Sequence, residues 1–453
     1  MQMNDKDLAQ KLAELVAERG GRAYFVGGHV RDRLRGIENK DIDIEVHGLY
    51  SKQLEEVLDQ IGDRMTIGES FGIYGLKGRH LDVALPRKEE KRGLGHKDFD
   101  ILVDPFIGTY KAALRRDFTI NALYEDVLTG QVIDHFGGLE DLEKGLIHHV
   151  NEVTFAEDPL RVLRAAQFAA RFGFEVAAET VDLCRTIDLT FLSKERVMGE
   201  LEKALLKAKK PSVFFEDLRE MGQLTTWFPE LEGTIGVIQD PRFHAEGDVW
   251  THTMMVLDQA AQYRSKAMDP LSFMLSALVH DFGKPLCTEV IDGKVHSYRH
   301  ELVGLPLVEA FMARLTSEKA LARYALNMTE LHMKPNVEAW VKASVKSTNR
   351  MFDRSVDPDA LILLALCDDS GRISQVNQGT NEDFLRERLQ IFREYMDRPH
   401  VMGRDLIEAG LKPSEKFSEY LDLAHKLRLA GIDKENALRQ VLGLARKEGE
   451  YEG

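Results

Sequence analysis

The spacing of hydrophobic residues changes near residue 139, where short strand-like runs give way to longer helical ones. Before that point, Leu8, Leu12, Leu15 and Val16 recur at helical spacing and predict an amphipathic helix over residues 5–19. Short apolar runs bounded by glycine or polar residues predict strands at 24–26, 40–46, 70–76, 80–85 and 131–134. Beyond residue 139 the pattern stays helical, most clearly over 157–172, 194–210, 249–263, 271–279 and 361–367.

Acidic side chains share one face of the strand at 40–46. Successive side chains of a strand point to opposite sides, so Asp41, Asp43 and Glu45 lie opposite Ile42 and Ile44. Two carboxylates that project together can hold a divalent metal, and hard oxygen ligands beside phosphate substrates favour Mg²⁺. Taken alone, this pattern is more typical of an ordinary acidic edge strand.

A glycine pair precedes this strand and changes the interpretation. The apolar strand at 24–26 breaks at Gly27 and Gly28 and leads into a helical segment that ends at Gly36. Backbone N–H groups can approach a phosphate at such a turn, and the helix dipole favours the negative charge there. With Arg31 in the same segment, the combination indicates phosphate chemistry.

Further candidate residues lie between the strands of the first part. Asp82, in the strand at 80–85, is either a third carboxylate of the site or a solvated acid on a sheet. Residues 86–112 show no clear periodicity and are expected to form a mobile functional loop. The segment 114–123 then sets Arg116, Asp117 and Asn121 beside apolar residues, which argues against a mere surface turn.

The clearest helix covers residues 157–172. Pro159 suits its first turn, Asp158 its N-terminal cap, and Gly173 its C-terminal stop. Asp158 and Arg161 share one face, with Arg164 next along it. A cap with an ion pair explains this pattern as well as a binding site does.

Lysines form one stripe of the helix predicted at 194–210. Lys203, Lys207 and Lys210 could track a phosphate backbone, although such a stripe is usually a solvated face, which remains the default interpretation. The formal net charge of −15 argues against a protein whose whole surface coats nucleic acid. Any RNA contact is therefore expected at local basic patches.

A second group of candidate residues lies on the later helices. His252, the adjacent His280 and Asp281, and the pair Asp368 and Asp369 fall within or at the ends of apolar helices. Histidines and carboxylates that converge from separate helices are a common way to build a hydrolytic metal site. A buried histidine alone is more often a hydrogen-bonded core residue, but the adjacent pair favours a metal site. His244, His300 and His332 either complete a larger site or stand apart from it.

The composition of the chain indicates the cellular compartment in which the protein is expected. The three cysteines of the 453-residue chain are odd in number and widely spaced, which favours a reducing compartment over a disulfide framework. The polar start does not resemble a signal peptide, and the longest apolar run, over residues 361–367, is far shorter than a membrane span. We therefore expect a soluble cytoplasmic protein that does not bind membranes.

Together, these motifs resemble those of the class II tRNA nucleotidyltransferases, the family of CCA-adding enzymes and bacterial poly(A) polymerases. The resemblance spans residues 24 to about 230 and rests on several ordered motifs: Gly27-Gly28-x-Val30-Arg31-Asp32, Asp41-x-Asp43, Arg115–Leu123, Glu157-Asp158-x-x-Arg161 and Lys194-Glu195-Arg196-Val197. Residues 242–372 are similar to the HD phosphohydrolase domain of some bacterial members, through Arg242-Phe243-His244, His252-Thr253, His280-Asp281 and His300-Glu301.

The resemblance implies an α+β fold with a polymerase-beta-like nucleotidyltransferase head built on a mixed sheet, followed by an all-α neck, an HD domain and a helical tail. The implied domains are residues 1–138, 139–235, 236–375 and 376–453. The catalytic residues would be Asp41, Asp43 and Asp82, with Mg²⁺ on Asp41 and Asp43. The nucleotide-binding residues would be Gly27, Gly28, Arg31, Arg116, Asp117, Asn121, Asp158, Arg161 and Arg164. Of these, Asp158 and Arg161 would read the Watson–Crick edge of CTP or ATP.

For the second site, the resemblance implies a divalent transition metal, of unspecified identity, on His252, His280, Asp281 and Asp368, with Asp369 as the alternative to Asp368. This site would have phosphatase or 2′,3′-cyclic phosphodiesterase activity. The implied partners are tRNA, with Lys203, Lys207 and Lys210 on the RNA, and CTP and ATP. The protein would act as a monomer or homodimer.

The implied reaction is template-independent addition of CCA to the 3′ end of tRNA. Residues 90–99 resemble the flexible loop of full CCA-adding enzymes, which favours this reaction over A-addition or poly(A) synthesis and leaves CC-addition last. Functions of another class are an HD phosphohydrolase whose head only binds nucleotide or RNA, and a non-catalytic RNA-binding protein. The presence of both Asp41 and Asp43 argues against each of them.

Overall fold

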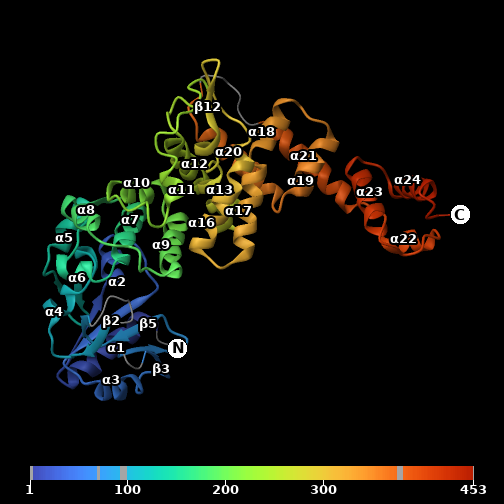
Figure 1. Ribbon diagram of the computed structural model, residues 1–453. Coiled ribbons are helices and arrows are strands. Elements are labelled where there is room, and N and C mark those ends of the chain that lie inside the picture. Colours follow the sequence, from blue (N-terminus) through green and yellow to red (C-terminus); the bar gives the residue numbers. More distant parts are fainter. Residues whose placement is uncertain (1–3, 69–71, 92–98, 375–380, 452–453) are drawn as a thin grey trace. The chain divides into compact units, whose positions relative to one another are not determined.

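The computed structural model describes residues 4–68, 72–91, 99–374 and 381–451. It divides the chain into two compact units, residues 1–227 and 228–453 (Figure 1). The first unit combines a sheet with helices, and the described part of the second is helical apart from one hairpin. Within the described ranges, no helix is long and apolar enough to cross a membrane.

A seven-stranded mixed sheet, in the order β3-β4-β5-β2-β1-β8-β9, is the framework of the first unit. Its strands are β1 (Arg22–Val26), β2 (Ile42–His47), β3 (Arg64–Gly68), β4 (Ile73–Leu76), β5 (Leu81–Ala84), β8 (Tyr124–Asp126) and β9 (Val132–Ile133). Helices α1 (Asp5–Glu18) and α3 (Ser51–Leu58) pack with Ile42, Ile44 and Val46 of β2 in one core. Because side chains alternate along β2, Asp43 projects from the opposite face of the sheet.

The described parts of residues 86–112 are ordered, so the prediction of a structureless loop is wrong there. Strands β6 (Arg87–Lys91) and β7 (Phe99–Val103) pair antiparallel, and α4 (Thr109–Leu114) follows them. The sequence of β6, RKEEK, has no apolar alternation that could signal a strand. The predicted flexible loop at 90–99 falls largely on residues 92–98, which lie outside the described residues.

Helices complete the first unit. They are α2 (Gly28–Leu34), the 3-10 helix η2 (Thr119–Asn121), α5 (Gly138–Lys144), α6 (Glu152–Ala156), α7 (Leu160–Phe172), α8 (Ala178–Arg185), α9 (Lys194–Lys207) and α10 (Ser212–Glu220). Gly173 ends α7 with a φ of +68°, a left-handed conformation that suits glycine. The expected all-helical character after residue 139 is interrupted here by the short parallel pair β10 (Leu146–Ile147) and β11 (Glu175–Val176).

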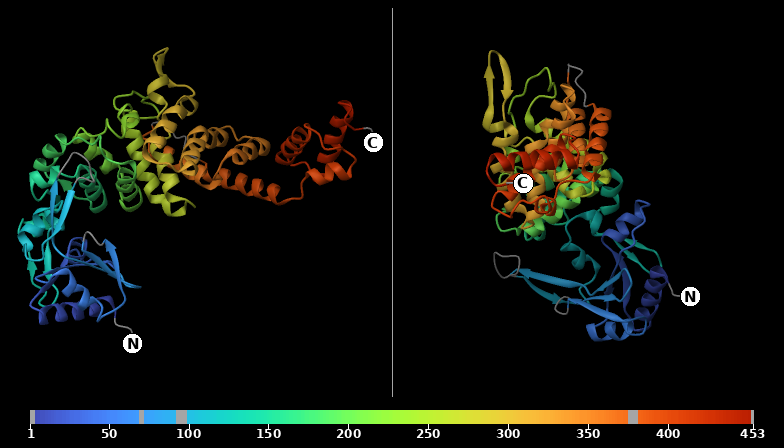
Figure 2. Two further views of the ribbon diagram at one scale, coloured as in Figure 1. Left: turned by 60° about the horizontal axis from the view of Figure 1, so that its bottom comes forward. Right: turned by 90° about the vertical axis from the view of Figure 1, so that its right-hand side faces the viewer.

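The second unit is a helical bundle with one protruding hairpin (Figure 2). Its first elements are α11 (Pro229–Glu232), α12 (Val249–Tyr263), η3 (Arg264–Lys266), α13 (Pro270–Val279), α14 (Lys284–Cys287), and the hairpin of β12 (Thr288–Ile291) and β13 (Lys294–Ser297). The later helices are α15 (His300–Val303), α16 (Leu305–Leu315), α17 (Lys319–Leu331), α18 (Met333–Trp340), α19 (Val345–Arg354), α20 (Pro358–Ser370), α21 (Glu382–Asp397), α22 (Gly403–Glu408), α23 (Phe417–Leu429) and α24 (Lys434–Lys447). The sequence analysis missed the hairpin, although Asp292-Gly293 is a typical hairpin turn.

Candidate functional sites

Asp43 and Asp82 lie side by side on the open face of the first unit's sheet. Strands β2 and β5 are parallel, and Asp43 pairs in register with Asp82. Both residues line a cavity of about 300 Å³, together with Arg87, Arg115 and Arg116. Partial burial and the charge of Asp82 raise the pKa of Asp43. Since a bound cation would relieve this repulsion, the two carboxylates fit a hard divalent metal.

Asp41, which precedes β2, is placed differently from the other two aspartates. Its side chain is 83% exposed, and its Oδ1 lies 3.6 Å from Nδ1 of His80. Two residues before Asp43, it shares that face of the strand but does not line the described cavity. The structure therefore brings Asp43 and Asp82 together and leaves Asp41 at the rim.

Glu45, further along β2, holds an arginine at the cavity. The side chain is 2% exposed, and Oε1 accepts hydrogen bonds from Tyr124 Oη at 2.8 Å and His47 Nε2 at 2.9 Å. Its Oε2 accepts from Arg116 Nη2 at 3.3 Å. Burial raises the pKa of Glu45, but the bond from His47 and the charge of Arg116 outweigh it and lower the pKa to about 2. The sequence analysis missed Glu45 as a site residue, although it shares a strand face with Asp43.

Gly27 provides the space that Arg116 occupies. The glycine has a φ of +63°, and a Cβ at this position would lie 3.3 Å from Arg116 Nη1. A larger residue would therefore be strained and would crowd the guanidinium. The glycine turn thus brings backbone, the first turn of α2 and one arginine together beside the carboxylates.

We expect Glu45→Gln to lower the free energy of unfolding by roughly 3 kcal/mol at pH 7, because it leaves the Arg116 charge uncompensated in a buried site. A depressed carboxylate pKa stabilises the folded state above the ordinary value of 4.5, and this stability is lost as the pH falls towards about 2. Urea unfolding at both ends of this pH range measures the effect. The exposed Glu56→Gln is the matched control, and equal unfolding free energies for the two variants would contradict the account.

The other residues predicted around the glycine turn form a buried network. Arg31 is 4% exposed, with Nη2 2.7 Å from Asp32 Oδ1, and its Nη1 donates to Asn121 Oδ1 at 2.6 Å. Asp117 accepts from Asn121 Nδ2 at 3.0 Å and from Arg164 Nη2 at 2.6 Å. The predicted nucleotide-binding residues are thus brought together, but these four bind one another and brace α2, η2 and α7.

Asp158 and Arg161 are also held by local partners at the start of α7. Asp158 Oδ2 lies 2.8 Å from Arg196 Nη2, and its Oδ1 accepts from a backbone N–H of the same helix at 3.1 Å. Arg161 donates to the carbonyl oxygens of Thr154 at 2.6 Å and Arg115 at 2.5 Å. The latter bond connects α7 to the backbone next to Arg116.

The predicted lysine stripe divides into two groups. Lys203 pairs with Glu200 at 2.8 Å. Lys207 and Lys210 instead line a cavity of about 660 Å³, whose other cations are Arg35, Arg171 and Lys209. Among the described residues, these five cations form no ion pair. They make a local basic patch in a chain with a net charge of −15.

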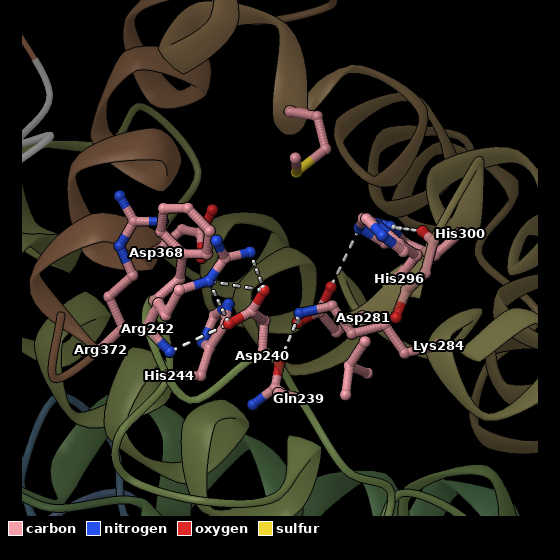
Figure 3. A pocket seen from close by; sticks show the side chains of 14 residues that line it. Gln239, Asp240, Arg242, His244, Asp281, Lys284, His296, His300, Asp368 and Arg372 are labelled. Atoms are coloured by element: carbon pink, nitrogen blue, oxygen red, sulfur yellow. Dashed lines mark hydrogen bonds and ion pairs between the residues drawn. The ribbon is translucent and has the colours of Figure 1, made fainter. Parts of the chain in front are cut away.

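Four histidines and two aspartates converge in the second unit, and Figure 3 shows three of these residues, His300, Asp281 and Asp368. His252 Nε2 lies 3.1 Å from Asp368 Oδ1, while His280 Nε2 and His300 Nε2 each lie 3.2 Å from an oxygen of Asp281. All five of these side chains are buried, and so is His332. Asp368 faces this cluster, whereas its neighbour Asp369 forms an ion pair with Arg372. The sequence analysis had left His300 and His332 open.

The orientation of three imidazoles fits a metal. Nδ1 of His280, His300 and His332 lies 2.8, 2.8 and 2.7 Å from the carbonyl oxygens of Ala277, Ser297 and Thr329. A carbonyl can only accept, so Nδ1 carries the hydrogen and Nε2 presents its lone pair, as in metal-binding histidines. Nε2 of His300 and Nε2 of His332 lie only 3.1 Å apart, which a shared proton or cation would stabilise.

Ligand atoms of this cluster form two triads that share Asp281. His252, His280 and Asp281 make one, and Asp281, His300 and His332 make the other, each with its atoms within 4.8 Å of one another. Burial, with the charges of His300 and His280, lowers the pKa of His332 to about 3, so its imidazole is neutral at pH 7. Burial disfavours the charged form of Asp281, but His280 and Lys284 hold its pKa well below the usual range. His332 and Asp281 are therefore in the states that metal ligands require, whereas carboxylate neighbours raise the pKa values of His252 and His300.

A cavity of about 300 Å³ opens onto Asp281 and Asp368. The segment carrying Gln239, Asp240 and Arg242 lies on one side, and His296 and His300 lie on the other (Figure 3). Lys284 Nζ donates to Gln239 Oε1 at 2.8 Å and lies 2.6 Å from Asp281 Oδ2. The cluster is therefore open to a small substrate.

Comparison with family models gives two matches, both before residue 235. Residues 23–148 match the "Poly A polymerase head domain", and residues 173–234 match the "Probable RNA and SrmB- binding site of polymerase A". Among curated proteins, the chain is similar to the "Multifunctional CCA protein" of Actinobacillus pleuropneumoniae serotype 5b and to that of serotype 7. Each is 37% identical over 316 residues, which cover 68% of this chain and 74% of the relative.

Solved structures show the same fold. A CCA-adding enzyme in complex with ATP matches with a TM-score of 0.67 at 20% identity, over 100% of this chain and 96% of that one. The Thermotoga maritima CCA-adding enzyme complexed with tRNA matches with a TM-score of 0.65 at 20% identity, over 98% and 96% of the two chains. The predicted α+β class, with a mixed sheet followed by helices, is confirmed.

Proposed function

The chain belongs to the class II tRNA nucleotidyltransferase family, and on that premise we propose that it adds CCA to the 3′ end of tRNA, using CTP and ATP. The observation that carries the proposal is the pair Asp43 and Asp82, held in register beside three arginines in one cavity. A head that only bound nucleotide would have little use for two repelling carboxylates. This argument favours a transferase over the two non-transferase alternatives.

The residues in and around this cavity have separate proposed roles. Asp41, Asp43 and Asp82 hold divalent metal, for which we propose Mg²⁺, and the metal supplies charge stabilisation at the attacking and leaving oxygens. Gly27, Gly28 and Arg116 receive the triphosphate, with Glu45 positioning Arg116. A network of four other side chains braces α2, η2 and α7 and so supports the site. These are Arg31, Asp117, Asn121 and Arg164.

Asp158 and Arg161 are the proposed readers of the incoming base. A carboxylate accepts from the exocyclic amine that C and A both carry, while a guanidinium donates to a ring nitrogen or carbonyl. UTP and GTP lack that amine at the corresponding position, so the pocket's polar groups would stay unpaired and both would be rejected. The test is extension of a tRNA transcript that ends before CCA, with all four nucleoside triphosphates at equal concentration. Product containing only C and A supports this role, and incorporation of U or G would overturn it.

The basic cavity of the first unit is the proposed RNA contact. Lys207, Lys209 and Lys210 are exposed and have no acidic partner among the described residues, so each is available to a phosphate. Lys203 forms an ion pair with Glu200, so it is the least available of the three predicted lysines for a phosphate. Substrate phosphates would replace counterions at this patch.

We therefore expect the combined variant Lys207→Gln, Lys209→Gln and Lys210→Gln to weaken tRNA binding and to reduce the slope of log affinity against log salt concentration. The slope should fall by about 2 to 3, because each lost phosphate contact removes about 0.9. Filter binding across a salt series measures it. Lys203→Gln is the matched control and should leave the slope unchanged. An equal loss for both proteins would refute the assignment.

A second activity is favoured by the three oriented imidazoles of the second unit. We propose a metal-dependent phosphatase or 2′,3′-cyclic phosphodiesterase of the HD class, with His252, His280, Asp281, His300, His332 and Asp368 holding a divalent transition metal. The bound metal would activate water and polarise the phosphate. Such a reaction would clean damaged tRNA ends before extension.

The four-domain division remains a proposal alongside this function. The head and neck, residues 1–138 and 139–235, would correspond to the first compact unit with a short extension. The HD domain and tail, residues 236–375 and 376–453, would make up the rest.

A further inference from the structure

One wall of the cavity above Asp281 is a hairpin rather than a helix. In the described chain, β12 and β13 pair only with each other, and His296 and Ser297 of β13 line the cavity. Thr288, at the base of the hairpin, donates to the carbonyl oxygen of Lys284 at 2.7 Å, which anchors the hairpin to the metal cluster's own segment. An isolated two-stranded hairpin is only marginally stable, so this hairpin depends on its attachment beside the site.

One aromatic ring of the hairpin, that of His296, lines this wall, and the ring of Tyr298, in the turn just after β13, stacks on it. The two rings are nearly parallel, with centroids 4.8 Å apart and planes 11° apart. His296 lines the cavity and is half-buried, whereas Tyr298 is 61% exposed and keeps open ring surface. Ring surface of this kind stacks on a nucleobase.

The opposite side of the same cavity is polar. Arg242 and Arg372 lie there, away from His296 (Figure 3), and Asp281 and Asp368 lie at the floor. A volume of about 300 Å³ is at the lower end of the range for small-ligand sites and suits one nucleotide better than a folded RNA segment. One wall is thus aromatic, while the floor and the facing wall carry charge.

We infer that His296 and Tyr298 form a stacking platform for the base of one ribonucleotide, whose 2′- or 3′-phosphate or 2′,3′-cyclic phosphate lies at the Asp281 cluster. This inference rests on the hydrolase proposed above and names the residues that hold the base of its substrate. For the cyclic ester, water adds its oxygen to phosphorus, one ring P–O bond breaks, and the released ribose oxygen takes the proton. The platform selects nucleotides over other phosphate esters without choosing among bases, because every base has a π-face.

The test compares two five-membered cyclic phosphodiesters, cytidine 2′,3′-cyclic phosphate and glycerol 1,2-cyclic phosphate, on the full-length protein loaded with Mn²⁺ or Ni²⁺. Tyr298→Ala should raise KM for the cytidine ester about tenfold, with kcat changed less than about twofold, because stacking acts on binding. The baseless ester should be hydrolysed equally by both proteins. Tyr298→Trp should restore the wild-type KM, and Val290→Ala, on the same hairpin, is the matched control.

The outcomes separate the platform from the hydrolase. Hydrolysis of both esters by the wild type, with equal effects of Tyr298→Ala on the two KM values, would overturn the platform and leave the hydrolase standing. A wild type that hydrolyses neither ester would overturn the hydrolase and, with it, the assigned substrate. His296→Ala provides a second variant, and the melting temperature of each variant shows that the fold is kept.

Discussion

Asp43→Asn should abolish nucleotide incorporation, with a loss of ~10³-fold or more, because several kcal/mol of charge stabilisation depend on metal held at this carboxylate. The side chain lies in register with Asp82 and lines the same cavity, and desolvation and the charge of Asp82 raise its pKa. Asparagine has the same size but cannot balance a divalent charge. Incorporation of labelled CTP into a tRNA transcript measures the effect.

Two controls test whether this loss is specific to the proposed active site. The exposed Asp63→Asn, on the same domain, should incorporate CTP at the wild-type rate. Binding of tRNA to Asp43→Asn should be unchanged, since the basic cavity with Lys207, Lys209 and Lys210 is separate from the carboxylates. Normal incorporation by Asp43→Asn would contradict the proposed active site.

The second large effect is expected for His280→Ala in the helical unit. Removing this ligand should lower metal-dependent cyclic phosphodiesterase activity by at least ~100-fold, since even residues that only support ligands cost 10–100-fold. CCA addition by the same protein should be unchanged, because no described residue of this unit lines the head cavity. Both activities are measured on one preparation, together with its metal content.

A matched control keeps the result interpretable. His400→Ala removes an exposed imidazole and should leave both activities and the metal content unchanged. Because His280 is fully buried, Asp281→Asn serves as a second variant if the alanine protein melts early. Full phosphodiesterase activity in folded His280→Ala would exclude the cluster as the hydrolytic site.

Local patterns predicted those parts of the fold that carry a clear period or cap. The acidic strand around Asp43 and the helix ended by Gly173 are found where the sequence indicated them. The hairpins β6–β7 and β12–β13 were missed. Among the described residues their strands pair only with each other, and such strands need no apolar alternation. The charged β6 shows no apolar alternation, whereas the Asp292-Gly293 turn is a hairpin signal that the prediction overlooked.

Contacts between residues far apart in the sequence are the part of the sites that the sequence did not predict. Nothing in the local pattern of Arg31 and Asn121, 90 residues apart, indicates that their side chains bind each other at 2.6 Å. The same is true of Glu45 and Tyr124, 79 residues apart. Residue types and spacing identified the chemistry, whereas the division between cavity-lining and bracing side chains required the fold.

The most direct measurement of the central claim uses three tRNA transcripts, ending before CCA, after C and after CC. Each is incubated with purified protein, Mg²⁺ and labelled CTP or ATP, and the products are resolved to one nucleotide. The account predicts that every transcript is extended to CCA and that extension then stops. Addition of a single A only to the transcript ending in CC, long A tails, or no incorporation would each contradict it.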